Sequence, residues 1–277
     1  MAGIRAMTAS DLDEVAAATE AGGFGNRREF FRMTLALGNC RPLVAVEHGR
    51  IVGTGLGSIH GRAGWIGVIF VAPELRRRGL GKALTEAVCA DLESAGCVSL
   101  VLVATDLGRP VYEKLGFRVQ TEYHMISGDP LDAAPTPPRG TRLRQITRAD
   151  LNGVAGLDRQ ATGEDRRALI EHFAASGWLL EGAGGELRGF LMPTVRGNGA
   201  LIAPEPDDAS CLLDLHRHLA PRDGHAWAGL ATEHEAGRRL LVDRGWFAWR
   251  TFPRMVRGED PAWQPSMIWG QFNHAMG

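Results

Sequence analysis

The stretch Ile69-Phe70-Val71-Ala72-Pro73-Glu74-Leu75-Arg76-Arg77-Arg78-Gly79-Leu80-Gly81-Lys82-Ala83-Leu84 decides the fold of this chain. A β-branched, apolar run ends at Pro73, a turn rich in arginine and glycine follows, and a helical pattern begins near Gly79. Glycine has no Cβ, so a bulky anion can approach the main chain closely. The first N–H groups of the new helix have no intrahelical acceptor and lie at the positive end of its dipole. The order strand, Arg-x-x-Gly-x-Gly, helix therefore predicts a pyrophosphate-binding turn.

Two better-known phosphate motifs do not fit this stretch. A P-loop requires Gly-x-x-x-x-Gly-Lys-Ser/Thr, whereas Lys82 precedes Ala83 and position 76 is arginine. A dinucleotide-binding turn requires Gly-x-Gly-x-x-Gly, which the local spacing does not provide. The plainer alternative is that Arg76–Arg78 form a solvated helix start, since single short motifs are weak evidence. A second motif is therefore needed to decide.

That second motif is Leu100-Val101-Leu102-Val103-Ala104-Thr105-Asp106-Leu107-Gly108-Arg109-Pro110-Val111-Tyr112-Glu113-Lys114-Leu115-Gly116-Phe117. It has the pattern of a strand, a short loop, a helix and a terminating glycine. Together, the two motifs in this order make residues 1–126 resemble the GNAT superfamily of acetyl-CoA-dependent N-acetyltransferases. The resemblance implies that the first motif is the pyrophosphate loop and that the second is the other acetyl-CoA helix.

The resemblance also implies roles for individual residues. Tyr112 occupies the position that is often the general acid, and its hydroxyl is protonated at neutral pH because a tyrosine pKa is about 10. A packed aromatic side chain is the alternative role for this tyrosine. Thr105 stands where relatives often carry asparagine. The residues that would bind the cofactor, either as a strand edge for the pantetheine arm or as the pyrophosphate loop, are Ile69, Phe70, Val71, Arg76, Arg77, Arg78, Gly79, Leu80, Gly81, Lys82 and Thr105.

No general base can be assigned from the sequence. The predicted strand 65–71 carries no carboxylate, although many GNAT members place one there. Candidates elsewhere are Glu47, His60, Glu122 and His124, each of which is as readily explained by a structural or surface role. His216 and His218 are two residues apart on a predicted helix and point in different directions, so no metal site is expected.

Composition is that of an ordinary globular enzyme. The chain has 277 residues, a formal net charge of −1 and 44% hydrophobic residues. The near-neutral charge argues against a nucleic-acid partner, and no apolar run reaches bilayer length. Its four cysteines lack metal or disulfide spacing and are expected to be reduced, as in the cytoplasm. The sequence is compatible with a homodimer.

An internal repeat predicts two domains. Residues 4–16 reappear as residues 143–155, each copy reading as a strand followed by an Asp-initiated helix. Between the copies, residues 127–140 contain four prolines and little apolar content, which is typical of a linker. We therefore expect a catalytic GNAT domain over 1–126, a linker over 127–140, and a degenerate GNAT-like domain over 141–277.

The second copy has lost the residues that carry the chemistry. Leu201-Ile202-Ala203-Pro204 corresponds to residues 70–73, but Glu205, Asp207 and Asp208 then replace the arginines and glycines. Leu241 stands where the first copy has its tyrosine. We expect this domain to bind no CoA. Five tryptophans near the chain end are expected to pack in the core or, less simply, to form an acceptor wall; they are Trp227, Trp246, Trp249, Trp263 and Trp269.

Periodicity predicts an α/β (α+β) fold in which each domain has a mixed, mostly antiparallel twisted sheet flanked by helices. For the first domain the expected strands are 3–7, 43–47, 51–59, 65–71, 98–104 and 117–126. The expected helices run from a Ser10 cap to about Glu20 and over 27–37, 79–94 and 108–115. Gly67, inside a strand, suggests a β-bulge or a close backbone approach.

Three functions remain open on this basis. The favoured one is transfer of an acetyl group from acetyl-CoA to the amine of a small molecule, with Phe24, Arg27 and Arg28 helping to form the acceptor pocket. The second is acetylation of a peptide N-terminus or lysine. The third is a non-catalytic acyl-CoA sensor or interaction protein.

Overall fold

The computed structural model describes residues 2–194 and 198–277, and within the last long strand the side chains of Ala248 and Trp249 lie outside the description. The chain divides into two compact units. The first comprises the chain up to Val119 together with Met255–Asp260 and Met276, and the second comprises Gln120–Arg254, Pro261–Ala275 and Gly277. Unlike the domain boundaries expected from the sequence, this division gives the segment Met255–Asp260 to the first unit and residues 127–140 to the second.

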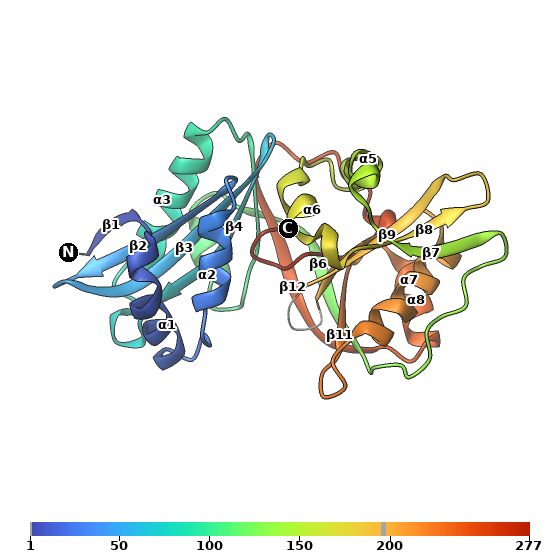
Figure 1. The fold of residues 1–277 in the computed structure, drawn as a ribbon. Helices are drawn as coiled ribbons and strands as arrows, with labels where there is room; N and C mark the ends of the chain where they lie inside the picture. The colour runs from blue at the N-terminus through green and yellow to red at the C-terminus, as the bar shows by residue number, and fades with distance from the viewer. Residues whose placement is uncertain (1, 195–197) are drawn as a thin grey trace. The chain divides into compact units, whose positions relative to one another are not determined.

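The first unit alternates strands and helices in the predicted order (Figure 1). Its strands are β1 (Gly3–Ala6), β2 (Cys40–Glu47), β3 (Arg50–His60), β4 (Ala63–Val71) and β5 (Ser99–Val103). Its helices are α1 (Leu12–Ala21), α2 (Arg28–Ala36), α3 (Leu80–Ser94) and α4 (Arg109–Lys114). Each lies within a few residues of its predicted range.

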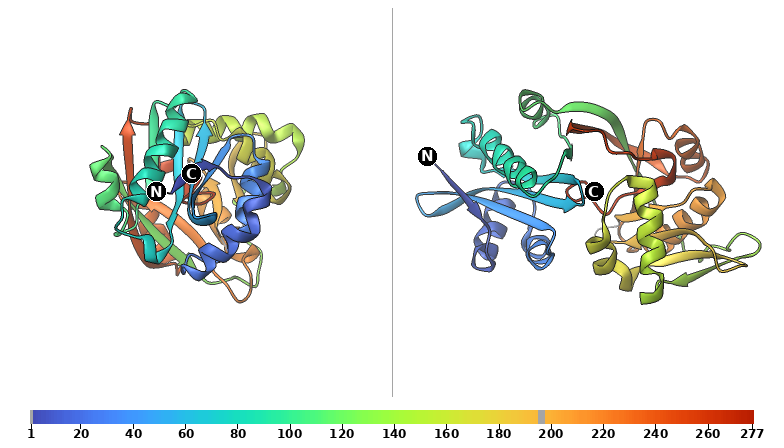
Figure 2. Two further views of the ribbon diagram at one scale, coloured as in Figure 1. Left: turned by 90° about the vertical axis from the view of Figure 1, so that its left-hand side faces the viewer. Right: turned by 90° about the horizontal axis from the view of Figure 1, so that it is seen from above.

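The sheet of the first unit is mixed and mostly antiparallel. Antiparallel pairs join β1 to β2, β2 to β3 and β3 to β4, whereas β4 and β5 are parallel. The right-hand view of Figure 2 shows α3 on one face of this sheet and α1 and α2 on the other. Buried side chains of α3 such as Val88 and Leu92 pack on the sheet beside Leu100 and Met255. A second apolar cluster joins Val15 of α1 to Phe31 of α2.

The N-terminus of α1 corrects the expected cap. Thr8, not Ser10, forms the capping box, with its side chain and backbone N–H both bonded to the carboxylate of Asp11. A short 3-10 turn over Ala9–Asp11 precedes the helix and places Ser10 beside the Thr8 hydroxyl instead of at the helix start. The reciprocal Thr-x-x-Asp arrangement satisfies two otherwise unpaired groups, which Ser10 alone would not do.

The second unit repeats this order. Its strands are β6 (Arg118–Gly128, which begins in the first unit), β7 (Thr141–Gln145), β8 (Trp178–Gly182), β9 (Leu187–Pro193), β10 (Gly199–Ile202), β11 (Ala226–Ala231), β12 (Phe247–Gly258, whose last residues belong to the first unit) and β13 (Ile268–Gly270). Its helices are α5 (Leu151–Thr162), α6 (Arg167–Phe173), α7 (Pro206–Leu219) and α8 (Glu235–Asp243).

Five of these strands form one sheet in the order β13-β10-β9-β8-β7, and β6 pairs antiparallel with β11. Leu212 and Leu215 of α7 pack with Leu241 of α8 against Leu191 of β9, so these two helices cover one face. Figure 1 shows α5 and α6 on the other face of these strands. Two helix-flanked sheets of this kind confirm the predicted α/β fold class.

Among the residues that the structure describes, none of the helices combines the length and apolar character needed to cross a bilayer.

Candidate active site

The most distinctive feature of the first unit is that β4 and β5 pair over only three residues. Ala63, Gly64 and Trp65 pair with Ser99, Leu100 and Val101, and no further pair joins the two strands in the described chain. Beyond Trp65, β4 remains paired to β3 on its other side as far as Val71. The backbone groups of residues 66–71 that face β5 are therefore not used by the sheet, and an extended amide-containing chain could bond to them as an added strand.

A β-bulge interrupts β4 at the beginning of this unpaired edge. The register of β4 against β3 shifts between Thr54 and Leu56, and Val68 has a φ of 51°. The sequence suggested Gly67 for this irregularity, but the left-handed residue is the β-branched Val68, for which this conformation is strained. The fully buried Thr54 donates its hydroxyl to the Val68 carbonyl oxygen at 2.9 Å, which holds the bulge in place.

Thr54 was not identified from the sequence. Its signal was a hydroxyl residue between Gly53 and Gly55 in a mostly apolar strand. Both glycines are tightly packed, because a Cβ at Gly53 would lie 2.8 Å from a Leu84 methyl group and one at Gly55 would lie 3.0 Å from Val88. Close packing of α3 on β3 thus fixes the strand that holds the bulge.

The turn after β4 leads into α3 with its N-terminal amides exposed. Arg77 and Gly79 have positive φ values of 63° and 84°, so the chain curls back on itself before Leu80. The first intrahelical bond runs from the Ala83 N–H to the Gly79 carbonyl oxygen, which leaves the N–H groups of residues 80–82 without an intrahelical acceptor. A Cβ at Gly81 would have only Val71 nearby, at 3.6 Å. This concave backbone suits an anion.

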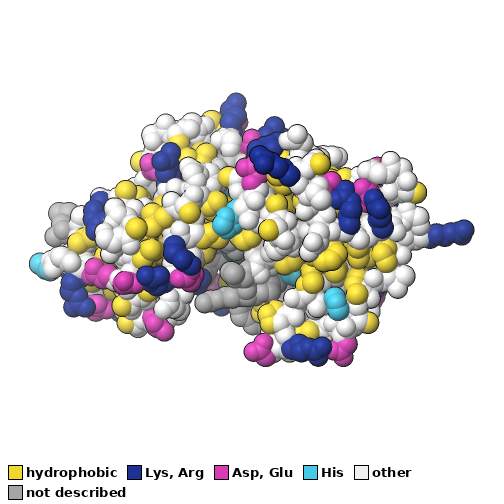
Figure 3. Space-filling model, in the orientation of Figure 1, with side chains coloured by type: hydrophobic (Ala, Val, Ile, Leu, Met, Phe, Trp, Pro, Cys, Tyr) yellow, Lys and Arg dark blue, Asp and Glu magenta, His cyan; other side chains and the backbone are white. Residues whose placement is uncertain are grey.

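The basic residues of this turn differ in what they contact. Arg76 donates to the Val71 carbonyl oxygen at 3.1 Å and to the Gly22 carbonyl oxygen at 3.4 Å, so it joins the turn to the loop after α1. Lys82 forms an ion pair with Glu86, one helical turn on, at 2.5 Å. Arg77 and Arg78 are exposed and make no hydrogen bond or ion pair with the described residues. Figure 3 shows charges of both signs dispersed over the visible face.

Tyr112 lies in α4, packed rather than exposed. A Cβ added to Gly108 would lie 2.8 Å from its ring, and the Phe117 ring centroid lies 6.1 Å away in an edge-on arrangement. Burial raises the pKa of Tyr112 to about 12. Its hydroxyl has no hydrogen-bond partner among the described residues, and it stays protonated across the physiological pH range.

Thr105 forms hydrogen bonds to the backbone at the start of α4. Its hydroxyl accepts a hydrogen bond from the Gly108 N–H at 3.2 Å, and its carbonyl oxygen accepts from the N–H groups of Gly108 and Arg109. The predicted contact of this side chain with a cofactor remains a prediction.

The loop between α1 and α2 lies against β4. The rings of Phe24 and Phe70 are 5.7 Å apart, and the Arg27 guanidinium lies 5.2 Å from the centre of the Phe24 ring. Arg28 forms an ion pair with Asp13 at 2.6 Å and a longer one with Glu29 at 3.5 Å. Of the three residues expected in an acceptor pocket, Phe24 and Arg27 are thus brought to β4, while Arg28 is directed to α1.

Among the candidate bases of the first unit, His60 lies away from the unpaired edge of β4. His60 is the buried last residue of β3 and pairs with Ala63, the first residue of β4. Its Nε2 lies 2.7 Å from the Met276 carbonyl oxygen. Glu122 and His124 belong to the second unit, where the His124 Nε2 lies 3.1 Å from the Thr232 hydroxyl. Within the described chain no cluster of three or more potential metal-ligating side chains occurs.

The corresponding turn of the second unit is acidic, as the sequence indicated. Pro206 begins α7, and the carboxylate of Asp208 in its first turn is buried and bonded to Arg188 at 2.7 Å. Counted from the helix start, Asp208 stands where α3 has Lys82. Glu205 and Asp207 are exposed beside it.

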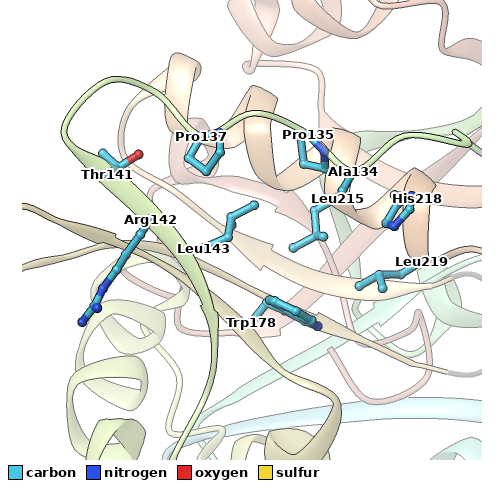
Figure 4. Close-up of a pocket in the computed structure, with 10 residues that line it drawn as sticks. All are labelled: Ala134, Pro135, Pro137, Thr141, Arg142, Leu143, Trp178, Leu215, His218 and Leu219. Atoms are coloured by element: carbon cyan, nitrogen blue, oxygen red, sulfur yellow. The ribbon is translucent and has the colours of Figure 1, made fainter.

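A separate pocket of about 380 Å³ lies in the second unit, between the proline-rich segment and α7 (Figure 4). Most of its lining is apolar, with Trp178 and Leu143 on one side. Its polar groups already have partners: Arg142 bonds to Glu181, and the His218 Nδ1 lies 3.1 Å from the Leu131 carbonyl oxygen. These bonds anchor the proline-rich segment to the unit, and none of the predicted site residues lines this pocket.

Comparison with known proteins gives a consistent result. Residues 13–117 match the model of the Acetyltransferase (GNAT) family. The uncharacterized N-acetyltransferase YitH of Bacillus subtilis is 27% identical over 201 residues, which cover 68% of this chain and 67% of that protein. The glucosamine 6-phosphate N-acetyltransferase of Trypanosoma brucei brucei is 43% identical over 77 residues, which are 25% of this chain and about half, 52%, of that protein.

Solved structures share the fold along the whole chain. A putative acetyltransferase from Pyrococcus horikoshii has a TM-score of 0.83 and 21% identity, covering 100% of this chain and 96% of that one. A tandem GNAT protein from the clavulanic acid biosynthesis pathway has a TM-score of 0.64 and 16% identity, covering 95% and 100%. The tandem arrangement predicted from the internal repeat is therefore confirmed at the level of the fold.

Proposed function

We propose that this chain, which belongs to the GNAT superfamily of N-acetyltransferases, transfers the acetyl group of acetyl-CoA to the amine of a small molecule. The reaction takes place in the first unit. The observation that carries the proposal is the unpaired edge of β4 beyond Trp65, which leads directly into the exposed amides of α3.

The residues of this edge fit the two parts of the co-substrate. The amide groups of a pantetheine arm match the unused backbone groups of residues 66–71. The pyrophosphate matches the N–H groups of residues 80–82, where Gly81 leaves room that a larger side chain would fill. The exposed arginines Arg77 and Arg78 supply countercharge to the phosphates.

When bound, the co-substrate supplies a thioester, whose carbonyl carbon is attacked by the amine nitrogen while the carbon–sulfur bond breaks. Backbone N–H groups near Phe70 and Val71 stabilise the negative charge that develops on the carbonyl oxygen. The attacking nitrogen loses one proton to solvent as the amide forms. The Tyr112 hydroxyl donates a proton to the departing sulfur and regains one from solvent. The bulge at Val68, held by Thr54, sets the direction of the backbone groups that follow it.

The acceptor is a small amine. The aromatic pair Phe24–Phe70, with Arg27 over Phe24, offers an apolar wall beside a cation close to the unpaired edge. The match to a protein named glucosamine 6-phosphate N-acetyltransferase covers 77 residues at 43% identity, and it favours a small molecule over a peptide. Four free, buried cysteines are consistent with a reducing compartment, and we place the enzyme in the cytoplasm.

The test is release of free CoA from acetyl-CoA in the presence of separate amine panels. One panel holds amino sugars, polyamines and aromatic amines, and the other holds peptides with free N-termini or lysines. We expect turnover with at least one small amine. Turnover with peptides alone would replace this proposal by protein acetylation, and tight acetyl-CoA binding without turnover on any amine would indicate a sensor.

A further inference from the structure

The second unit contains a copy of the β4 edge in which that edge is already paired. By the order of elements and the internal repeat, β10 corresponds to β4, α7 to α3 and β11 to β5. β10 pairs with β9 on one side and antiparallel with β13 on the other, with Leu201 opposite Gly270 and Ile202 opposite Ile268. The Ala203 N–H also donates to the Met267 carbonyl oxygen at 3.0 Å. β13 also lies against β11, so it lies between the two strands whose counterparts separate in the first unit.

Trp269 holds β13 in this position. Its side chain is completely buried, and its indole N–H donates to the Ala203 carbonyl oxygen at 3.0 Å. The His234 ring contacts the indole, with the two ring centroids 4.3 Å apart. Both the donor and the apolar surface of this tryptophan are therefore fully used within the second unit.

The residues on either side of β13 are fixed as well. The Gln264 N–H donates to the Ala161 carbonyl oxygen at 2.6 Å. Gln271 accepts from Arg166 at 3.1 Å and donates to the Tyr123 hydroxyl at 2.9 Å, and Arg166 in turn holds the buried Asp158. Release of the segment would take the Gln271 acceptor from the buried Arg166 guanidinium, and an unmet buried donor is costly, so this network favours the bound position of the segment.

The helix terminus beside this edge is also occupied by the chain itself. The buried carboxylate of Asp208 lies in the first turn of α7, where its charge complements the helix dipole. Arg188 pairs with it at 2.7 Å. A negative group and an added strand thus take the two places that a pyrophosphate and a pantetheine arm take in the proposed site of the first unit.

We infer that the segment Pro265–Gln271 is a built-in strand that replaces the pantetheine arm in the second unit, so this unit is closed to acyl-CoA and the chain binds one acyl-CoA. The inference rests on the proposed cofactor position in the first unit for its comparison. The occupancy of the β10 edge is a property of the second unit alone, and it can be measured without any cofactor.

Hydrogen exchange of the full chain tests the inference directly. In the unliganded protein we expect slow exchange for backbone amides of Ala203, Ile268 and Gly270, and no change when acetyl-CoA is added. Amides of residues 66–71 are expected to gain protection under the same conditions. Rapid exchange of the β13 amides, or their release by acetyl-CoA, would overturn the inference. Failure of residues 66–71 to respond would count against the proposed function only.

A pair of glycine variants adds a matched control. A Cβ at Gly270 would lie 2.4 Å from the Gly199 carbonyl oxygen, so Gly270→Ala must push β13 away from β10. A Cβ at Gly229 on β11 meets nothing closer than 3.5 Å, so Gly229→Ala should be tolerated. We expect exchange of the β13 amides to rise about tenfold in Gly270→Ala, a loss of about 1.4 kcal/mol, and to stay unchanged in Gly229→Ala. Equal behaviour of the two variants would contradict the inference, and if Gly270→Ala does not fold, the wild-type measurement decides.

Binding stoichiometry gives an independent result. Equilibrium dialysis with acetyl-CoA should find one site per wild-type chain, and the affinity of that site should fall about tenfold or more in Gly81→Asp, in which a carboxylate lies in the first unit's turn. A second site per chain, with an affinity that Gly81→Asp does not change, would refute the closure of the second unit.

Discussion

The guanidinium of Arg5 bonds to both carboxylate oxygens of Asp11, at 2.7 and 2.8 Å. Arg144 and Asp150 repeat this pair in the second unit, at 2.8 Å for both bonds. In each unit the same carboxylate also closes the capping box with a threonine, Thr8 or Thr147. The internal repeat is therefore preserved in its contacts as well as in its residues.

This pair predicts an acid-dependent loss of stability. Hydrogen bonds from Arg5 hold the pKa of Asp11 well below its ordinary value. A carboxyl with a lowered folded-state pKa stabilises the fold above its unfolded pKa of about 3.9, and that contribution is lost as the pH falls through the folded pKa. Asp11→Asn should therefore cost about 1 kcal/mol near pH 7, as for other caps, and less below about pH 4.

Denaturant unfolding of wild type and Asp11→Asn at a series of pH values from about 2 to about 7 measures this difference. Asp13→Asn is the control, because Asp13 is exposed and pairs with Arg28 at the surface. A gap between wild type and Asp11→Asn that stays constant down to the lowest pH would show that the carboxylate charge does not contribute.

The turn before α3 gives a prediction about cofactor affinity. Gly81→Asp places a carboxylate against the expected pyrophosphate, and we expect acetyl-CoA binding to weaken about tenfold or more. Gly81→Ala is the control, since its Cβ would lie at an ordinary 3.6 Å from Val71 and adds no charge. Calorimetric titration of both variants with acetyl-CoA separates the effect of the added charge from the effect of the added side-chain volume. Unchanged affinity in Gly81→Asp would remove the pyrophosphate from this turn.

The bulge in β4 gives a prediction about turnover. Thr54→Val keeps the shape of the side chain but removes the hydroxyl that bonds to the Val68 carbonyl oxygen. Leaving that part-buried carbonyl unpaired costs at most about 1–3 kcal/mol, and the bulge should relax. We expect a lower kcat with a smaller change in the KM for acetyl-CoA, because the bulge orients backbone groups at the reacting carbonyl.

Thr54→Ser retains the hydroxyl and should restore most of the turnover. Loss of stability without any change in kcat would show that Thr54 acts only on the fold. Both variants can be assayed with whichever amine supports CoA release in the wild-type protein.

The local elements could be predicted from the sequence, because short-range signals determine them. The residues Arg76–Gly81 indicate both the end of β4 and the start of α3. Periodicity locates the other helices to within a few residues. The prediction failed where two local signals competed. Ser10 is a good capping residue, but Thr8 and Asp11 bond to each other, so the capping residue is Thr8 and a 3-10 turn precedes α1.

Non-local pairing could not be predicted. Ile268-Trp269-Gly270 is too short to read as a strand, and its partner β10 is more than sixty residues earlier in the chain. The sequence placed Trp269 in the core without indicating which edge it would cover. In the same way, nothing near Met255–Asp260 shows that this segment belongs to the first unit. Tyr112 and the turn before α3 lie within local sequence motifs, so both could be proposed from the sequence. Thr54 bonds to Val68 on the neighbouring strand, and no local motif indicates that contact.

The last prediction concerns Tyr112. If its hydroxyl protonates the departing sulfur, Tyr112→Phe should lower turnover about 10²-fold, the lower end of the range for general acid–base catalysis. A CoA thiolate is already a fair leaving group, so a larger loss is not expected. Cofactor affinity should stay nearly the same, and the ring should still pack against Phe117.

Because burial raises the pKa of Tyr112 to about 12, no loss of activity from its deprotonation is expected below about pH 10. Leu241→Tyr, the matching change in the second unit, should create no activity, since the turn before α7 is acidic. Turnover equal to wild type in Tyr112→Phe, measured where chemistry limits the rate, would show that the tyrosine is structural.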